Sequence, residues 1–382
     1  MPTVGIICEY NPLHLGHSKQ LSMVRQHFGE DTAIVCVMSG NYVQRGAPAL
    51  VDKSLRAAAA IHSGADLVLE LPVTYALSSA EGFARGGVKI LSHCCDYLCF
   101  GAETADGSLL MNTAKLLLSD SFPPALRSQL DTGKSFPAAC AAALEQLGLK
   151  GAPVASPNDI LAVEYCKAIL QTDSAMKPWP IRREGCYHDE LPDPQNPSAT
   201  ALRRLMLSKE NWECYTPVPE WFRNAPLHTT QAGERAILMK LRTMTDEEFE
   251  ALPYGSEGLW RKFMHACRSC ATLEQIIAAT KSKRYTRSRI DRMMMCAFLG
   301  ITRDLLNEKP PYTTVLAFND RGRSVLKQMK QHTVCINPGE SFDHPFHVLE
   351  KRCGDLYGLF CTGIPEAPGT EENRRVYYRK AT

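Results

Sequence analysis

The chain has 382 residues, of which 45% are hydrophobic and 22% are charged, and its formal net charge is +2. These values are ordinary for a globular protein with enough core for two or three domains, and they exclude a disordered or collagen-like chain. No apolar stretch approaches the roughly 18 residues that a transmembrane helix needs, and no signal-peptide pattern is evident. Because the net charge is small, a polyanion would have to bind a local basic patch.

The cysteine pattern indicates a reducing compartment. Fifteen cysteines are present, and many lie inside apolar segments, as Cys36 and Cys99 do. They are expected to act as small buried hydrophobic residues, so we predict a cytoplasmic protein. Cys267 and Cys270 have the Cys-x-x-Cys spacing but lack a second pair, so helix core is favoured over a zinc site and no metal site is predicted.

The first predicted elements are a buried strand over residues 4–8 and an amphipathic helix over residues 18–28. The turn between them contains His14-x-Gly16-His17, which opens the helix. A helix N-terminus offers unpaired N–H groups that bind phosphate, and histidines three apart share one helix face. Gly16 lets a ligand approach the backbone closely. The alternatives are two surface histidines, or a zinc pair, which would need a third ligand.

The following segments alternate between strand and helix. Strands are predicted over residues 32–38, 64–72 and 95–100, and helices over residues 53–62 and 80–91. Fully apolar strands in this order indicate a parallel sheet covered on both faces. Ligands bind beyond the carboxyl ends of such strands. The loops after Cys8, Met38, Leu71 and Phe100 should therefore face a single site.

The second half is mainly helical. Helices are predicted within residues 105–150, from Ser156, from Ser198 and throughout 233–305, with an extended segment over 179–183. A strand over 313–318, a helix over 322–329 and a strand over 334–336 precede an irregular tail. The predicted fold is α/β: a Rossmann-like domain with a parallel sheet over residues 1–195, then a mainly helical region with a small α/β portion over residues 196–382.

Several motifs then occur in order along the chain. They are Gly5-Ile6-Ile7-x-Glu9-Tyr10-Asn11-Pro12-x-His14-x-Gly16-His17, Met38-Ser39-Gly40-Asn41-Tyr42-Val43-Gln44-Arg45-Gly46, Ala65-Asp66-Leu67-Val68-Leu69-Glu70-Leu71-Pro72, Phe100-Gly101-x-Glu103, Pro157-Asn158-x-Ile160-Leu161-Ala162-x-Glu164-Tyr165, Tyr187-His188-Asp189 and Ser198-Ala199-Thr200. By these motifs the chain resembles the bacterial tRNA(Met) cytidine acetate ligase family, which is part of the His-x-Gly-His nucleotidylyltransferase superfamily.

The resemblance implies a nucleotidylyltransferase-like catalytic domain that converts acetate and ATP to acetyl-adenylate. The acetyl group then passes to N4 of the wobble cytidine of elongator tRNA(Met), and neither DNA nor a membrane is involved. His14 and His17 are the implied catalytic residues, and no dedicated cofactor is implied beyond ATP with Mg²⁺. The implied ATP contacts are Ile7, Cys8, Glu9, Tyr10, Asn11, Pro12, Leu13, His14, Leu15, Gly16, His17, Ser18, Lys19, Gln20, Gly101, Asn158, Arg182 and Arg183.

A basic run near residue 285 is the predicted tRNA-binding patch. Six basic residues stand against one acid between Lys281 and Arg292, and we expect tRNA phosphates to contact Lys283, Arg284, Arg287 and Arg289. The alternative is a solvated helix face. Likewise, Asn158 could be only a helix cap, and either arginine of the Arg182-Arg183 pair could be only a solvated charge.

Two other functions fit the histidine motif. One is a small-molecule nucleotidylyltransferase, although the long helical second half would then need another purpose. The other is a non-catalytic RNA-binding protein that senses ATP, which the presence of His14, Gly16 and His17 disfavours.

Overall fold

A computed structural model describes residues 1–183, 197–329, 334–337 and 342–380. Its centre is a sheet in the order β10-β8-β5-β2-β1-β6-β7, with β9 beside β8. The strands are β1 (Thr3–Cys8), β2 (Ala33–Ser39), β5 (Leu67–Leu71), β6 (Tyr97–Ala102), β7 (Lys177–Arg182), β8 (Tyr312–Asn319), β9 (Val334–Ile336) and β10 (Tyr377–Arg379). A separate hairpin pairs β3 (Tyr42–Val43) with β4 (Ala47–Pro48).

The sheet is mostly parallel, which confirms the predicted α/β class. β1 pairs in parallel with β2 and β6, β2 with β5, and β6 with β7. Only β5 and β8 pair in antiparallel fashion among the described strands of this sheet. β2 and β5 are buried along their whole length, which is why they are continuous apolar runs rather than alternating ones.

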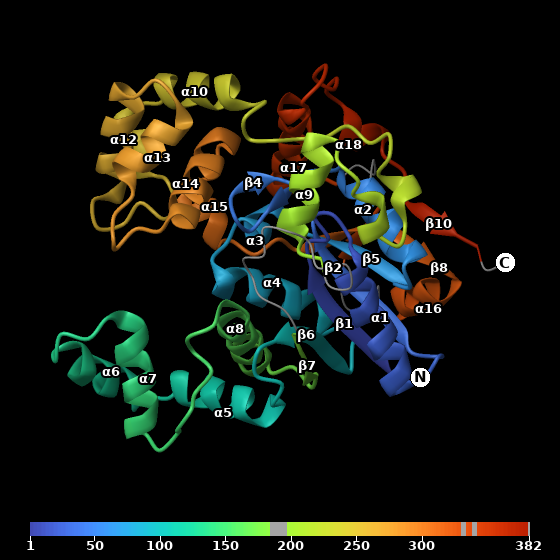
Figure 1. The fold of residues 1–382 in the computed structure, drawn as a ribbon, viewed down its shortest axis with the longest axis horizontal. Coiled ribbons are helices and arrows are strands. Elements are labelled where there is room, and N and C mark those ends of the chain that lie inside the picture. The colour runs from blue at the N-terminus through green and yellow to red at the C-terminus, as the bar shows by residue number, and fades with distance from the viewer. Residues whose placement is uncertain (184–196, 330–333, 338–341, 381–382) are drawn as a thin grey trace.

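Helices cover both faces of the sheet (Figure 1). Ile34, Cys36 and Met38 of β2 pack with α1 (Leu15–Phe28), α2 (Lys53–His62) and α9 (Ala199–Ser208). The alternate β2 residues, Val35 and Val37, pack on the other face. The helices there are α4 (Ala80–Leu91), α5 (Gly107–Leu117), α8 (Pro157–Gln171) and α16 (Asp320–Met329).

Two helical groups lie outside this sandwich (Figure 1). The larger contains α10 (Glu234–Thr243), α11 (Asp246–Glu250), α12 (Leu259–Ser269), α13 (Leu273–Thr280), α14 (Arg287–Leu299) and α15 (Arg303–Asn307), and it shares a core with α17 (Pro345–Tyr357). The smaller contains α6 (Phe122–Leu130) and α7 (Phe136–Gln146). The remaining short helices are α3 (Val73–Ala76), α18 (Thr370–Asn373), η1 (Glu213–Tyr215), η2 (Pro219–Trp221) and η3 (Gly358–Phe360).

The prediction of an irregular tail after residue 336 is wrong. The tail contains α17, which buries Phe346, Leu349, Cys353 and Tyr357 at helical spacing, and β10, which pairs with β8. The side chain of His344 caps α17 by accepting from the Phe346 amide. Histidine is not a usual N-cap residue, so the start of this helix carries a weak sequence signal.

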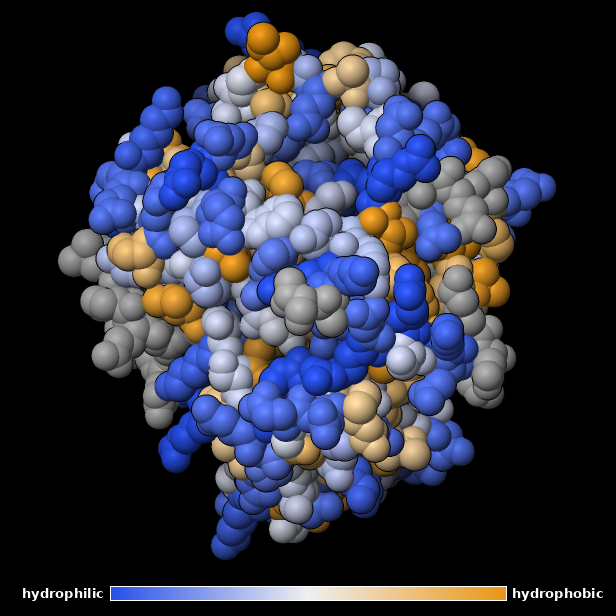
Figure 2. Space-filling model, turned by 90° about the vertical axis from the view of Figure 1, so that its right-hand side faces the viewer, coloured by the Kyte–Doolittle hydropathy of each residue, from blue (hydrophilic) through white to orange (hydrophobic). Residues whose placement is uncertain are grey.

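The C-terminal strands belong to the same sheet as the N-terminal ones, since β8 pairs with β5. The predicted domain boundary between residues 195 and 196 lies outside the described residues and stays a prediction. Within the described ranges, none of the helices combines the length and apolar character needed to cross a membrane. Figure 2 shows hydrophilic side chains interspersed with separate hydrophobic patches on the face that lies at the right of Figure 1.

Candidate nucleotide-binding site

The turn between β1 and α1 places two imidazoles at a helix N-terminus. His14 is the N-cap residue of α1, and its Nδ1 accepts a hydrogen bond from the Gly16 amide at 3.1 Å. The Nδ1 of His17 accepts from the His14 amide at 3.3 Å. The two rings stack with their centroids 3.7 Å apart. The histidines therefore share one helix face, as their spacing predicts.

These hydrogen bonds determine where the imidazole protons lie. Because Nδ1 accepts a hydrogen bond in both rings, each neutral ring carries its proton on Nε2. Burial, with smaller contributions from the nearby charges of Arg183 and Arg203, lowers the pKa of His14 to about 3. Burial, His14 and Arg183 also lower the pKa of His17. Both rings are thus neutral near pH 7, and each offers an Nε2–H donor rather than a positive charge.

A second set of site residues lies at the ends of β6 and β7. The Arg183 amide donates to the Ala102 carbonyl at 2.9 Å, and its guanidinium donates to the Asn158 side-chain oxygen at 3.1 Å. The Asn158 amide nitrogen donates to Glu103 at 2.6 Å. The alternative that Asn158 is only a helix cap is wrong, because the N-cap of α8 is Ser156 and Asn158 connects the carboxylate of Glu103 to Arg183.

Gly101 makes room for the stem of Arg183. A Cβ atom added at Gly101 would lie 2.9 Å from Cγ of Arg183, which is too close for an ordinary contact. The two neighbouring arginines also differ. Arg182 is the last residue of β7 and Arg183 follows it, and successive residues of a strand point to opposite sides. Only the charge of Arg183 contributes to the pKa values of both histidines.

Most other predicted contact residues support the turn from inside the protein. Glu9 accepts from the Gln44 amide at 2.7 Å, and Asn11 accepts from the Leu50 amide at 2.7 Å. Tyr10 is buried and has a φ of 42°. The others lie along the same segment: Ile7 and Cys8 end β1, Pro12 and Leu13 are buried in the turn, and Leu15, Ser18, Lys19 and Gln20 are on α1.

Two arginines that the sequence analysis did not single out also contact this turn. Arg203 of α9 donates to the Asn11 carbonyl at 2.8 Å. Arg56 of α2 is 0% exposed and donates to the carbonyls of Glu9 at 2.6 Å and of Gly40. It also donates to the Ser39 and Val51 carbonyls. The sequence did contain a signal for the role of Arg56, because it is a charged residue within an alanine-rich helix.

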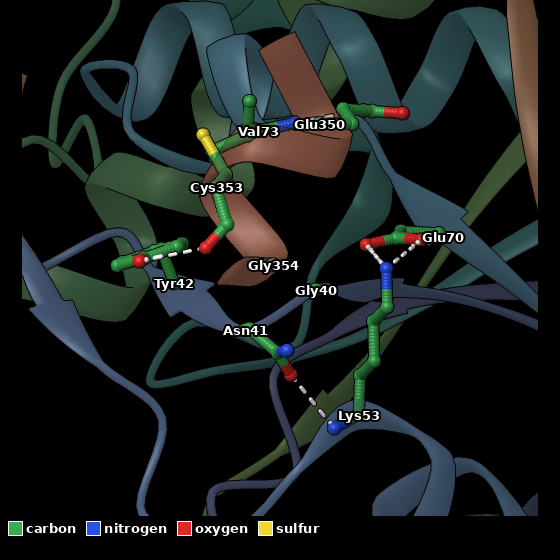
Figure 3. A pocket seen from close by; sticks show the side chains of 9 residues that line it. All are labelled: Gly40, Asn41, Tyr42, Lys53, Glu70, Val73, Glu350, Cys353 and Gly354. Atoms are coloured by element: carbon green, nitrogen blue, oxygen red, sulfur yellow. Dashed lines mark hydrogen bonds and ion pairs between the residues drawn. The ribbon is translucent and has the colours of Figure 1, made fainter. Parts of the chain in front are cut away.

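The expectation that the loops after β2 and β5 join this site holds only in part. The loop after β2 contacts the histidine turn, since Gln44 donates to Glu9 and Leu50 donates to Asn11, but the start of this loop and the loop after β5 line a different pocket. C-terminal residues cover them around a pocket lined by Gly40, Asn41, Tyr42, Lys53, Glu70, Val73, Glu350, Cys353 and Gly354 (Figure 3). There the buried Lys53 ammonium lies 2.7 Å from both Glu70 and Glu371. The Tyr42 hydroxyl donates to the Cys353 carbonyl at 2.9 Å. The histidines, Gly101 and Arg183 lie near the ends of β1, β6 and β7, and none of them lines this pocket.

The predicted tRNA patch lies at the start of α14, apart from the β1–α1 turn (Figure 1). Lys283 is exposed, but Arg284 pairs with Glu257 and Arg287 pairs with Glu274. Arg289 donates to the Tyr254 carbonyl. Acidic residues distant in the sequence thus offset part of the charge that the basic run predicts.

Two further expectations concern other parts of the chain. The motif Tyr187-His188-Asp189 lies outside the described residues. Cys267 is buried within α12, in agreement with its assignment to helix core, whereas Cys270 follows the end of α12 and is half-buried. In the described part of the chain, no group of three or more His, Cys, Asp or Glu side chains is arranged to hold a metal ion.

Comparisons with known proteins agree with this geometry. The family model of the HIGH nucleotidyl transferases matches residues 1–359. The tRNA(Met) cytidine acetate ligase of Clostridium acetobutylicum is 36% identical over 355 residues, covering 87% of this chain and 88% of that protein. The enzyme of the same name from Alkaliphilus metalliredigens is 34% identical over 423 residues, covering 100% of this chain and 99% of that protein.

A solved structure is similar along the whole chain. The crystal structure of Thermotoga maritima TmcAL bound with alpha-thio ATP has a TM-score of 0.88 and 28% sequence identity, with 100% of both chains covered. The apo form of the same protein has a TM-score of 0.90. The histidine turn, the sheet order and these matches together show that the chain belongs to the HIGH nucleotidyl transferase family, among its tRNA(Met) cytidine acetate ligases.

Proposed function

We propose that this protein uses ATP to activate acetate and transfers the acetyl group to N4 of the wobble cytidine of elongator tRNA(Met). The relatives that carry the name tRNA(Met) cytidine acetate ligase support this reaction, and so does the T. maritima neighbour bound with alpha-thio ATP. The observation that carries the proposal is the pair of stacked, neutral imidazoles at the N-terminus of α1.

In the first step, an acetate oxygen attacks the α-phosphorus of ATP and pyrophosphate leaves. Acetate is ionised at neutral pH, so this step needs alignment and stabilisation of charge on the phosphate oxygens rather than a general base. The Nε2–H groups of His14 and His17 are suited to donate to phosphate oxygens, and the guanidinium of Arg183 supplies a positive charge nearby. Removing one donor of this kind typically lowers the rate about a hundred- to thousandfold.

The proposed ATP contacts divide into two groups by their surroundings. His14, Gly16, His17, Gly101 and Arg183 lie at the ends of β1, β6 and β7, where a nucleotide bound beyond the sheet would touch them. The second group contacts other parts of the protein and would hold the turn in place; it contains Glu9, Tyr10, Asn11 and Leu13. Magnesium would enter with the ATP phosphates as part of the substrate.

In the second step, the exocyclic amine of cytidine attacks the acetyl carbonyl carbon of acetyl-adenylate. The bond from this carbon to the phosphate oxygen breaks, AMP leaves, and the amine loses a proton. The wobble base must be presented unpaired for this attack. We propose that Lys283, Arg284, Arg287 and Arg289 hold the tRNA backbone. Among the described residues, no carboxylate forms an ion pair with Lys283 or Arg289.

Incubation with ATP, radiolabelled acetate and total bacterial tRNA, followed by nucleoside analysis, tests the whole reaction. We expect the label in N4-acetylcytidine, and label in any other nucleoside would refute the proposal. Acetate-dependent exchange of labelled pyrophosphate into ATP tests the first step alone. Exchange without acetate would instead indicate a nucleotidylyltransferase with a different acceptor.

Variants of α1 test the role of the histidines. His17→Ala should abolish the exchange while tRNA binding stays near the wild-type value. His27→Ala is a matched control, because it removes an exposed histidine at the other end of the same helix. Equal exchange rates in the two variants would contradict the assignment.

A further inference from the structure

The outward side of α12 carries four exposed basic side chains. Arg261, His265 and Arg268 share one helix face because they are four and three positions apart, and Lys262 lies beside that face. The opposite face buries Leu259, Phe263, Met264, Ala266 and Cys267 in the helical core. No Asp or Glu occurs within α12.

This face differs from the basic run in how its charges are offset. Arg284 and Arg287 each pair with a glutamate, and on α12 Arg268 pairs with Asp246. By contrast, Arg261 and Lys262 have no carboxylate within ion-pair distance among the described residues. Their charges are therefore more available to an external anion than the paired arginines are.

The surroundings of these two cations hold them in place without neutralising them. The guanidinium of Arg261 lies 4.9 Å from the centre of the Trp260 ring, a cation–π arrangement that keeps its N–H groups available. The ammonium of Lys262 donates to the Lys281 carbonyl at 3.3 Å. This contact joins the α12 face to the turn that carries Lys283, so the two form one surface.

We propose that this surface, defined by Arg261, Lys262 and His265 of α12 together with Lys283, binds the sugar-phosphate backbone of the tRNA substrate. The inference rests on the proposed function, since it names where the acceptor of the second step is held. Charge complementarity supports RNA as the occupant, because phosphates are recognised by lysine and arginine without a need for sequence readout. α12 lies apart from the sheet (Figure 1), so it would contact tRNA away from the reacting base.

Filter binding of elongator tRNA(Met) transcript to the full chain tests the surface. The double variant Arg261→Ala/Lys262→Ala should raise the dissociation constant about tenfold near physiological salt. It should also reduce the slope of log affinity against log salt by about 1–2, since each lost phosphate contact removes about 0.7–0.9. The charge-preserving variant Arg261→Lys/Lys262→Arg should bind within about twofold of wild type.

The matched control is Arg323→Ala/Lys327→Ala, which removes two exposed cations from α16 and changes the net charge equally. Binding that falls equally in the control and the α12 variant, or stays at wild-type strength in both, overturns the inference. So does loss of binding in the charge-preserving variant when its thermal unfolding midpoint matches wild type. Pyrophosphate exchange by the wild-type protein distinguishes the two failures: if it requires acetate while the α12 variant binds tRNA normally, only the α12 surface is refuted. If the wild type neither exchanges nor binds tRNA, the proposed function fails as well.

Discussion

Replacing Arg56 with methionine should destabilise the protein and disorder the histidine turn. The Arg56 side chain is completely buried and donates to four backbone carbonyls, those of Glu9, Ser39, Gly40 and Val51. Each buried acceptor left without a donor costs about 1–3 kcal/mol, and methionine recovers part of this through apolar burial. The expected net loss is about 3–5 kcal/mol, the range typical of breaking a buried charged network.

Urea unfolding followed by circular dichroism measures this loss of stability, and calorimetry measures the ATP dissociation constant of the folded variant. Arg56→Lys should lose less stability, because an ammonium keeps the charge but cannot span all four carbonyls. Arg223→Met is the control, since it breaks an exposed ion pair with Glu213 and should cost far less stability than Arg56→Met. Similar losses in Arg56→Met and Arg223→Met would refute the role given to Arg56.

Three further predictions concern the site and its support. The lowered pKa of His14 means that the unfolded chain binds its proton below about pH 6.5 while the folded chain does so only near pH 3, so stability should fall with falling pH. Urea titrations at pH 6 and pH 4 measure this change in the free energy of unfolding. Between the two pH values, His14→Gln should lose about 2 kcal/mol less than wild type, and equal losses would contradict a neutral His14 ring. Gly101→Val should displace Arg183 and weaken ATP binding about tenfold by calorimetry, with the unfolding midpoint nearly unchanged; wild-type affinity would show that the space is not needed. Lys53→Met should leave the buried Glu70 carboxylate unpaired, while Glu371 keeps its ion pair with Arg374, and should cost about 3–5 kcal/mol in urea; a loss below about 1 kcal/mol would contradict the burial of this cluster.

Local sequence patterns identified the elements that build the site. The helix over residues 53–62 and the helix over residues 80–91 have the predicted bounds, because their apolar periodicity and caps are local properties. β1 and β2 were recognisable as continuous apolar runs, because both belong to a buried parallel sheet. The short β10 was missed, because an edge strand depends mainly on its partner β8.

The sequence by itself determined the histidine turn at the start of α1, since strand, turn and helix cap are formed by neighbouring residues. Only the tertiary structure decided which charges meet there. The charges of Arg183 and Arg203 lower the pKa of His14, whereas Glu257 and Glu274 pair with arginines of the basic run. The physical reason is that helix and strand patterns depend on residues a few positions apart. Ion pairs and buried hydrogen bonds join residues distant in sequence. Only the folded structure therefore shows which charged side chains can still bind a ligand.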